Sequence, residues 1–343
     1  MLPEAREAMA EAMASWANPS SPHAEGRAAR AALEGARERI NLALDWQHEL
    51  IFTSGASEAI GLALACARAR KTFVSPTEHD AVLRAAGDAQ RLVIDGLGRI
   101  DGGKLNWALA AEEARVLVAI QSVNNETGVR QNLEDLAARI HVGGHLLFAD
   151  CSQSAGKLPL PPADLIAISA HKLGGPPGIG ALLVRDLAML DALGGQEKGY
   201  RPGTENVPAA LGFAAAVETP RGWLDRAAAL RDHLDKAIEH AGGSAVAAKA
   251  DRIATIAGYR MPGMTAATQL IQFDLAGIAV SAGSACSSGS LKSSRILATM
   301  GWSEAEADEV IRVSFGPRTE RGDIYRFVEV WKRLAEGARN RAA

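Results

Sequence analysis

The sequence predicts an α/β protein: a large domain with a mostly parallel seven-stranded sheet flanked by helices, followed by a smaller α+β domain. Two observations carry this prediction. Up to residue 185, short β-branched or apolar runs alternate with Ala-rich helical stretches, which is the pattern of helices packed on a parallel sheet. After residue 205 the helical stretches lead to a smaller unit with fewer strand candidates.

The expected strands of the large domain are apolar runs that end at polar or Gly residues. They cover residues 49–54, 71–75, 91–95, 115–123, 145–150, 164–170 and 180–185. Helices are expected at 4–16, 23–43, 55–69, 79–89 and 133–141, and the second of these repeats its apolar positions every three or four residues. Beyond residue 205 we expect helices at 206–218, 221–241, 291–300, 303–309 and 320–338, and strands near 252–258, 276–281 and 311–315.

The domain boundaries follow from these elements. We expect residues 1–16 to form a helix that packs on the small domain, residues 17–240 to form the large domain, and residues 241–343 to form the small domain. No Pro/Ser-rich linker separates the parts, so the small domain is expected to pack tightly on the large one.

Composition and charge exclude several classes of function. Lys and Arg total 37 against 40 Asp and Glu, for a net charge of −3, and no block of five like charges occurs. This argues against a nucleic-acid groove or a polybasic membrane anchor. Charged residues or Gly interrupt every apolar stretch before it could span a membrane. The amino terminus is amphipathic and carries acids, unlike a secretory signal, so the predicted location is the cytoplasm.

The three cysteines differ in their surroundings. Cys66 fits a buried helix face, the usual fate of a lone Cys, whereas Cys151 could belong to the core or to a pocket wall. Cys286 lies in the run SAGSACSSGS with no large apolar neighbour, and it is the candidate nucleophile. No CxxC pair or His/Cys cluster has zinc-ligand spacing, so we expect no separate metal site.

A phosphate site is one interpretation of the run TSGASEA at 53–59. A strand ends at Thr53, Gly55 makes a turn, and a helix opens at Ala56 and Ser57. The first N–H groups of a helix lack internal partners and suit an anion. The alternative is an ordinary strand–turn–helix in which Ser54 or Ser57 caps the helix.

Two further runs place polar groups after buried strands, where open α/β sheets bind ligands. Asp150 could cap a turn or pair with a cationic ring nitrogen, and Gln153 would present its amide to the same cavity. The run SAHKLGGPPGIG carries Lys172 at a strand end. In a pocket its ammonium would be desolvated and suited to Schiff-base chemistry; most lysines are instead solvated surface residues.

Together these runs resemble the cysteine desulfurases, pyridoxal-phosphate enzymes of the class V aminotransferase group with the type I fold. Nine motifs occur in the family's order along nearly the whole chain: NPSSPHAEGR, TSGASEA, TEHDAV, VNNETGV, ADCSQSAGK, SAHKLGGPPGIG, RPGTEN, SAGSACSSGS and RVSFGPRT. The form of the motif around Cys286 is similar to that of the nitrogen-fixation and iron–sulfur-cluster desulfurases.

The resemblance assigns roles around pyridoxal 5′-phosphate, the implied cofactor. Lys172 would hold it as a Schiff base and, once freed, remove the substrate's α-proton. Asp150 would pair with the ring nitrogen, and His79 would stack on the ring and relay protons. Gln153 would donate to the phenolate oxygen, with Asn125 near that oxygen and the substrate carboxylate. Read alone, His79 could simply cap a helix and Asn125 could satisfy a turn.

The resemblance also assigns the phosphate, the substrate and the sulfur. The phosphate cradle would comprise Ala56, Ser57, Ser169 and His171. Thr204 would reach the phosphate of the neighbouring subunit, which implies a homodimer. Arg312 would bind the α-carboxylate of L-cysteine in a bidentate fork, although it could instead be an ordinary ion-pair partner. Cys286 would take the sulfur as a persulfide and pass it to an acceptor such as an iron–sulfur scaffold, with transient iron–sulfur ligation allowed.

Three departures from the family pattern stand out. The family begins with a segment of the form Y-L-D-x-x-A-T-T-P, whereas this sequence begins at MLPEAREAM. The segment is missing, the start was assigned to an internal methionine, or the chain was trimmed. Ser57 replaces a commoner threonine and keeps the hydroxyl, and Pro177 replaces a frequent lysine. The rival interpretations are a selenocysteine lyase, a small-substrate aminotransferase, or a non-catalytic paralogue.

Overall fold

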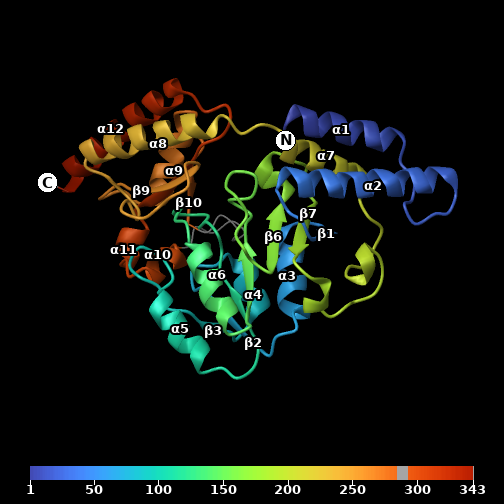
Figure 1. Ribbon diagram of the computed structural model, residues 1–343. Helices are drawn as coiled ribbons and strands as arrows, with labels where there is room; N and C mark the ends of the chain where they lie inside the picture. Colours follow the sequence, from blue (N-terminus) through green and yellow to red (C-terminus); the bar gives the residue numbers. More distant parts are fainter. Residues whose placement is uncertain (284–292, 343) are drawn as a thin grey trace. The chain divides into compact units, whose positions relative to one another are not determined.

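A computed structural model describes residues 1–283 and 293–342 (Figure 1). The chain divides into two compact units. Unit 1 comprises Met1–Leu92, Gly102–Ser122 and Gln131–Pro220, and unit 2 comprises Val93–Asp101, Val123–Arg130 and Arg221–Ala343. This division differs from the expected one, because two short excursions join unit 2 early in the chain and unit 1 ends at Pro220. In the described ranges, each helix is too short or too polar to span a bilayer.

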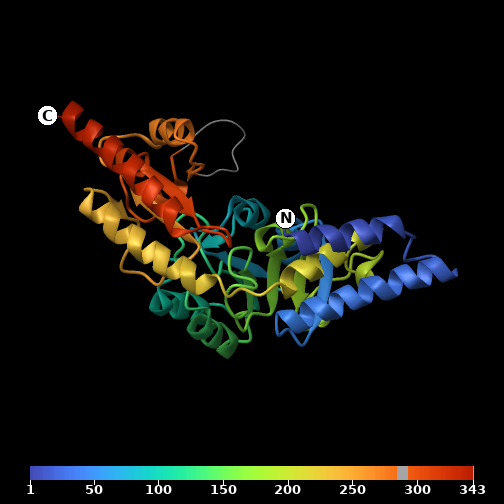
Figure 2. The same ribbon diagram turned by 90° about the horizontal axis from the view of Figure 1, so that it is seen from above.

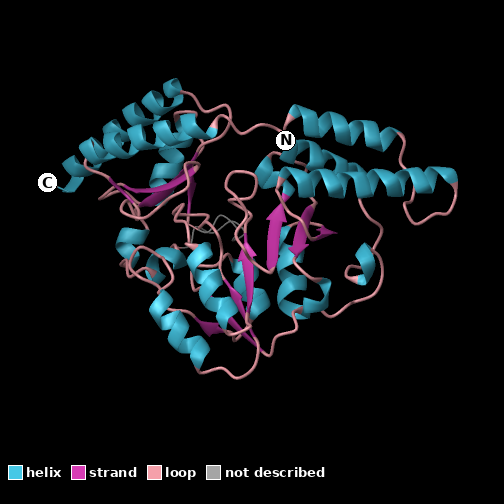
Figure 3. Ribbon diagram, in the orientation of Figure 1, coloured by secondary structure: helices cyan, strands magenta, loops and turns pink. Residues whose placement is uncertain are grey.

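The sheet of unit 1, whose strands are among the magenta arrows of Figure 3, confirms the predicted seven-stranded, mostly parallel architecture. Its strand order is β1-β7-β6-β5-β4-β2-β3. Its strands are Glu49–Thr53 (β1), Lys71–Val74 (β2), Gln90–Arg91 (β3), Val116–Ala119 (β4), Leu146–Asp150 (β5), Leu165–Ser169 (β6) and Gly180–Val184 (β7). Neighbours pair in parallel from β6 to β3, whereas β7 is antiparallel to both β1 and β6. The strands β4 to β7 are buried throughout, as in a sheet covered on both faces.

Helices of unit 1 bury apolar faces against this sheet and against each other. Helices α3 (Ala56–Cys66) and α4 (Asp80–Ala86) contribute Ala59, Ile60, Ala63 and Val82 to the core that contains Ile51 and Phe148. Helix α6 (Leu133–Val142) packs on β5, and α5 (Gly102–Ala110) packs on α6. Helix α2 (Ala24–Ala43) lies against α7 (Val207–Glu218).

Helix α1 (Pro3–Ala14) packs on α7 within unit 1 (Figure 2), whereas its expected packing on the small domain stays a prediction. Gly212 of α7 allows the close approach, because a Cβ there would lie 2.9 Å from the carbonyl oxygen of Ala5. Ahead of α1, the N–H of Leu2 donates to the carbonyl oxygen of Gly174 across 2.7 Å. The absence of a side chain at Gly212 therefore lets α1 pack closely on α7.

Unit 2 is built on a four-stranded antiparallel sheet in the order β10-β11-β9-β8. The strands are Ser281–Ala282 (β10), Val310–Ser314 (β11), Ile256–Arg260 (β9) and Ser244–Ala245 (β8), and the helices are Leu224–His240 (α8), Ala266–Leu275 (α9), Arg295–Thr299 (α10), Glu304–Ala307 (α11) and Arg321–Ala342 (α12). The core of this unit contains Trp331 and the stacked rings of Phe273 and Phe327, whose centroids are 4.7 Å apart.

Several elements differ from the sequence prediction. Strand β8 is absent from it, and β10 covers Ser281–Ala282 where a strand was expected near 276–281. The third strand is reduced to Gln90–Arg91, because the chain passes from unit 1 to unit 2 after Leu92. Helices α5 and α9 are absent from the prediction. Their first residues are Gly-Gly-Lys and Ala-Ala-Thr, and Gly and Thr have low helix propensity. In the structure Leu105 and Leu109 of α5 are buried, so packing overrides the weak local preference.

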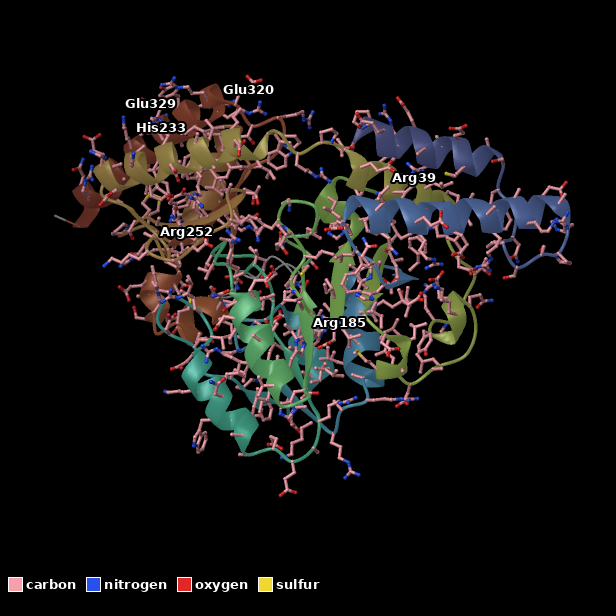
Figure 4. The ribbon with its side chains drawn as sticks, in the orientation of Figure 1. Arg39, Arg185, His233, Arg252, Glu320 and Glu329 are labelled. Carbon is pink, nitrogen blue, oxygen red and sulfur yellow. The ribbon has the colours of Figure 1, made fainter. Side chains whose placement is uncertain are left out.

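Two buried carboxylates anchor loops of unit 1 to the sheet. Glu197 accepts hydrogen bonds from Arg37 Nη1 at 2.9 Å and from the N–H of Phe52 at 2.7 Å. Asp164 accepts from the N–H of Leu147 at 2.7 Å and pairs with Arg185, which follows β7 at the edge of the sheet where the parallel strands begin (Figure 4). The predicted site residues that follow the strands lie at the opposite edge, where the parallel strands end.

Candidate cofactor site and active site

Four strands that point the same way deliver most of the predicted site residues to one edge of the unit 1 sheet. These residues are Ala56 and Ser57 after β1, His79 after β2, Asp150 at the end of β5, and Ser169, His171 and Lys172 at and after the end of β6. Thr53 and Ser169 pair with the same residue, Gly180 of β7, so the turns after β1 and β6 are close neighbours. The structure thus brings these groups to the edge at which α/β sheets bind ligands.

Helix α3 begins with an open amino-terminal end. Its N-cap is Gly55, which has no side chain to cap with, so the interpretation of Ser54 or Ser57 as the cap is wrong. A Cβ on Gly55 would meet nothing within 4 Å, and Ser57 is exposed. The N–H groups of Ala56 and Ser57 have no partner within the helix and carry its positive dipole end. This end of α3 therefore fits a phosphate.

The turn after β6 holds a second set of donors. Ser169 Oγ lies 2.9 Å from His171 Nδ1. Partial desolvation and the nearby charge of Lys172 lower the pKa of His171, so its ring is neutral at neutral pH. Lys172 lies on a 3-10 turn, Ala170–Leu173, that carries its side chain to the surface of the protomer. The expected desolvation of Lys172 is therefore absent from the single chain.

Asp150 is held in a fixed orientation at the end of β5. Its side chain is buried, and its Oδ1 accepts from the N–H of Ser152 at 2.9 Å and from Ser152 Oγ at 2.6 Å. Gln153 is half-buried in the following turn. Cys151 belongs to the core, and burial together with the charge of Asp150 raises the pKa of its thiol to about 12. Cys66 is also buried, as predicted.

His79 is the N-cap of α4, where its Nδ1 accepts from the N–H of Ala81 at 3.1 Å. The capping interpretation is therefore correct for one ring nitrogen, and in the neutral ring the proton then lies on Nε2. Beneath it, the fully buried carboxylate of Glu78 accepts from the N–H of Gln121 at 2.6 Å, and Gln121 Nε2 donates to the carbonyl oxygen of Thr77 at 2.6 Å. This network, to which no sequence pattern points, fixes the backbone that carries His79.

Asn125 and Arg312 are brought together in unit 2. Arg312 Nη1 on β11 donates to the carbonyl oxygen of Asn125 across 3.1 Å. The Oδ1 atom of Asn125 is buried and accepts no hydrogen bond from the described residues. Buried polar atoms are normally satisfied, so this atom marks a place for a ligand donor.

Arg312 also lines a small pocket of unit 2 with Glu126, Thr127, Gly283 and Ser294. Gly283 and Ser294 flank the part of the sequence that contains Cys286. Cys286 itself lies outside the described residues.

Thr204 is exposed on the loop that precedes α7. Ion pairs of Glu197 with Arg37 and of Glu205 with Arg30, each with a 2.9 Å contact, anchor this loop on both sides. The role of Thr204 at a neighbouring subunit's site stays a prediction.

One ion pair next to the α3 turn is also missing from the sequence analysis. Glu58, in the first turn of α3, accepts from Arg201 Nε at 2.9 Å and from the N–H of Ser54. Both residues lie inside quoted motifs, but 143 positions separate them in the sequence. The two motifs mark each residue separately, but their spacing in the sequence does not indicate that the two side chains meet.

Comparisons with known proteins identify the family. The model of the class V aminotransferases matches residues 2–327. A cysteine desulfurase of Gluconacetobacter diazotrophicus is 35% identical over 343 residues, which cover 92% of this chain and 85% of the relative. The chain belongs to the cysteine desulfurases of this family. The resemblance stated from the motifs is confirmed.

Solved structures of two similar proteins have the same fold. The NifS-like protein from Rickettsia africae has a TM-score of 0.89 and 27% identity, covering 98% of this chain and 96% of its own. A structure of SspA in complex with cysteine has a TM-score of 0.78 and 28% identity, covering 93% of this chain and 97% of its own. The expected fold class is therefore confirmed.

Pyridoxal 5′-phosphate is the cofactor of this family of enzymes, and the desulfurase's own residues fit it. The uncapped end of α3, the open space at Gly55 and the Ser169–His171 pair form a donor set for a phosphate. Asp150 supplies an oriented carboxylate for a protonated ring nitrogen, and Lys172 supplies an amine on the same edge of the sheet. The cofactor and enzyme class expected from the sequence are confirmed at the level of the family.

Proposed function

We propose that this protein removes sulfur from L-cysteine, producing L-alanine and a persulfide on Cys286. The observation that carries the proposal is the gathering of Lys172, Asp150 and the phosphate donors at one sheet edge, in a chain that belongs to the cysteine desulfurases. The cysteine complex of the similar protein SspA supports the choice of substrate.

The residues of unit 1 bind the cofactor and move a proton. The bound cofactor supplies an electron sink for the charge left at the substrate's α-carbon. The N–H groups of α3, with Ser57, Ser169 and His171, bind the phosphate, while Gln153 orients the ring. Asp150 keeps a proton on the ring nitrogen. The Nζ atom of Lys172 takes the α-proton, and His79, with its proton on Nε2, relays protons.

Arg312 and Cys286 act on the substrate itself. The guanidinium of Arg312 binds the α-carboxylate in a bidentate fork, held in place by its hydrogen bond to Asn125. The thiolate of Cys286 attacks the substrate sulfur. A sulfur–sulfur bond forms, the carbon–sulfur bond breaks, and its electron pair stays on the carbon, which is protonated to give alanine. In the overall reaction, L-cysteine and the thiol of Cys286 give L-alanine and the persulfide of Cys286.

The test compares the wild type with Cys286→Ser and Lys172→Ala. Cys286→Ser should keep the visible absorbance of the bound cofactor and release no alanine from cysteine, whereas Lys172→Ala should lose both the absorbance and the product. Cys66→Ala is the matched control and should keep both. Alanine release by Cys286→Ser at the wild-type rate would overturn the assignment of the nucleophile.

The proposed assembly is a homodimer in which Thr204 completes the phosphate site of the neighbouring subunit. The exposed position of Thr204 on an anchored loop supports this. Sedimentation should give twice the mass of one chain. In mixed dimers, a Thr204→Val chain should lower phosphate affinity only at its partner's site; an effect at its own site would contradict the proposal.

The sulfur acceptor is proposed to be an iron–sulfur scaffold protein in the cytoplasm, with transient iron–sulfur ligation by Cys286 during transfer. Protein loaded with sulfur-labelled cysteine should pass label to a purified scaffold, and Cys286→Ser should pass none. Retention of all label on the desulfurase would exclude that acceptor.

A further inference from the structure

Glu58 presents an electrostatic problem at the amino-terminal end of α3. Its carboxylate belongs to the first turn of the helix, where an acid normally stabilises the positive dipole end. The cofactor's phosphate, if bound at Ala56 and Ser57, would occupy the same positive end. Two anions would then compete for it, and like charges at short range repel.

Arg201 neutralises this carboxylate. Its Nε atom donates to Glu58 Oε1 across 2.9 Å, while Oε2 of Glu58 accepts from the N–H of Ser54. The side chains of Arg201 and Glu58 are 19% and 30% exposed, so solvent screens their attraction only in part. Burial alone raises the pKa of Glu58, but the Ser54 and Arg201 donors outweigh it and hold the pKa below its ordinary value. Glu58 is therefore ionised at neutral pH and depends on Arg201 for its counter-charge.

The loop that carries Arg201 is also anchored on both sides. Its loop carries ion pairs at every fourth residue, with Glu197 bound to Arg37 and Glu205 bound to Arg30. Gln196 Oε1 accepts from the N–H of Gly203 across 2.8 Å, which closes the turn between them. A guanidinium that is bonded to Glu58 and carried by an anchored loop needs little reorganisation when a phosphate binds.

We propose that Arg201 makes the α3 cradle selective for a phosphorylated ligand, by cancelling the charge of Glu58 and fixing the Ser54–Gly55 turn. Arg201 is thus a positioning residue that acts on the phosphate through Glu58. The inference rests on the proposed binding of pyridoxal phosphate at this cradle. It predicts an asymmetry, because removing the cation exposes a repulsive charge whereas removing the carboxylate does not.

The experiment measures the affinity of the full-length protein, freed of cofactor, for pyridoxal phosphate and for pyridoxal, which lacks the phosphate. Arg201→Met should weaken binding of pyridoxal phosphate about 10-fold or more and change pyridoxal binding by less than about 3-fold. Glu58→Gln keeps an oxygen for Ser54, and it should bind pyridoxal as the wild type does and pyridoxal phosphate at least as tightly, because the charge of Arg201 is then no longer cancelled. The double variant should regain most of the affinity that Arg201→Met loses.

Two further variants control for structure. Arg68→Met removes an exposed ion pair with Asp191 in the same unit and should leave both affinities unchanged. If Arg201→Met does not fold, Arg201→Lys keeps the charge and should keep the wild-type preference for the phosphorylated ligand.

The outcomes separate this inference from the proposed function. Equal weakening of both ligands in Arg201→Met, or no recovery in the double variant, would overturn the role of Arg201 while leaving desulfurase activity standing. A wild-type chain that binds neither ligand and releases no alanine from cysteine would overturn the proposed function itself.

Discussion

Arg312 and Asn125 are 187 positions apart in the sequence, yet the guanidinium of Arg312 donates to the main-chain carbonyl oxygen of Asn125 across 3.1 Å. The bond uses one nitrogen and orients the planar head group on β11. A guanidinium that the backbone orients in this way has a fixed planar geometry, which matches a carboxylate.

Replacing Arg312 with Lys should therefore raise KM for L-cysteine more than it lowers kcat. Lysine keeps the charge but cannot form the bidentate fork, and the loss of one charge-assisted hydrogen bond corresponds to a fall of about 10- to 100-fold in kcat/KM. Alanine release under steady-state conditions measures both constants. Arg321→Lys, on α12 beside Tyr325, is the control and should behave as the wild type. An unchanged KM in Arg312→Lys would contradict the assignment.

Gly174 directly follows the 3-10 turn that contains Lys172, and its carbonyl oxygen accepts a hydrogen bond from Leu2. Its substitution should destabilise the protein. Gly174 has φ of +87°, and a Cβ there would lie 2.7 Å from Leu2 Cγ. Gly174→Ala should lower the free energy of unfolding by about 1–3 kcal/mol, as measured with urea. Gly178→Ala is the matched control, because φ is +77° but nothing lies within 4 Å. Adding Leu2→Ala to Gly174→Ala should recover the part of the free energy of unfolding that Gly174→Ala loses beyond Gly178→Ala. Equal losses in the two glycine variants would show that Leu2 plays no part.

The buried thiols should be chemically silent in the folded protein. The pKa of Cys151 is raised to about 12 and burial also raises that of Cys66, so almost no thiolate forms near neutral pH. In a Cys286→Ser background, a maleimide reagent should label neither residue until denaturant is added. Mass spectrometry of the labelled peptides reports each site separately. Rapid labelling of Cys151 under native conditions would contradict its place in the core.

His171 should make the protein less stable as the pH falls. Its pKa in the folded state lies below the ordinary value of 6.5, so the unfolded chain binds more protons in the window between the two values. The contribution of His171 to stability is complete above pH 6.5 and is lost as the pH falls through the folded-state pKa. Urea unfolding at several pH values should show a shallower loss for His171→Asn than for the wild type. Parallel curves would place the pH dependence elsewhere.

Local sequence patterns were sufficient for the elements whose core face is continuous. Strand β5 is a run of buried Leu, Phe and Ala that ends at Asp150, so both the strand and the polar residue at its end could be predicted. The edge strand at Gln90–Arg91 could not, because its length depends on where the chain leaves unit 1. The packing of α1 was also unpredictable, since Ala5 is its one fully buried residue among positions 3–14 and a weak apolar face does not specify a partner.

The candidate site divides in the same way. Asp150 and Ser169 end strands and Lys172 follows one, and the family's motifs predict a role for each. The hydrogen bonds that fix the backbone near His79 and at the start of α3 could not be predicted, because Gln121 meets Glu78, and Arg201 meets Glu58, only after the sheet has formed. Exposure is also a property of the tertiary structure: the sequence places Lys172 at a strand end, but a 3-10 turn brings it to the surface.

The hydrogen bond between Leu2 and Gly174 has a practical consequence for handling the protein. Because it holds the first residues beside the turn that carries Lys172, any affinity tag joined ahead of Met1 would emerge next to that turn. Such a tag would obstruct cofactor loading at this turn, and a polyhistidine tag would add titratable groups beside Lys172. Purification through a removable tag, with activity compared before and after cleavage of the tag, would show how much the tag changes the activity of the enzyme.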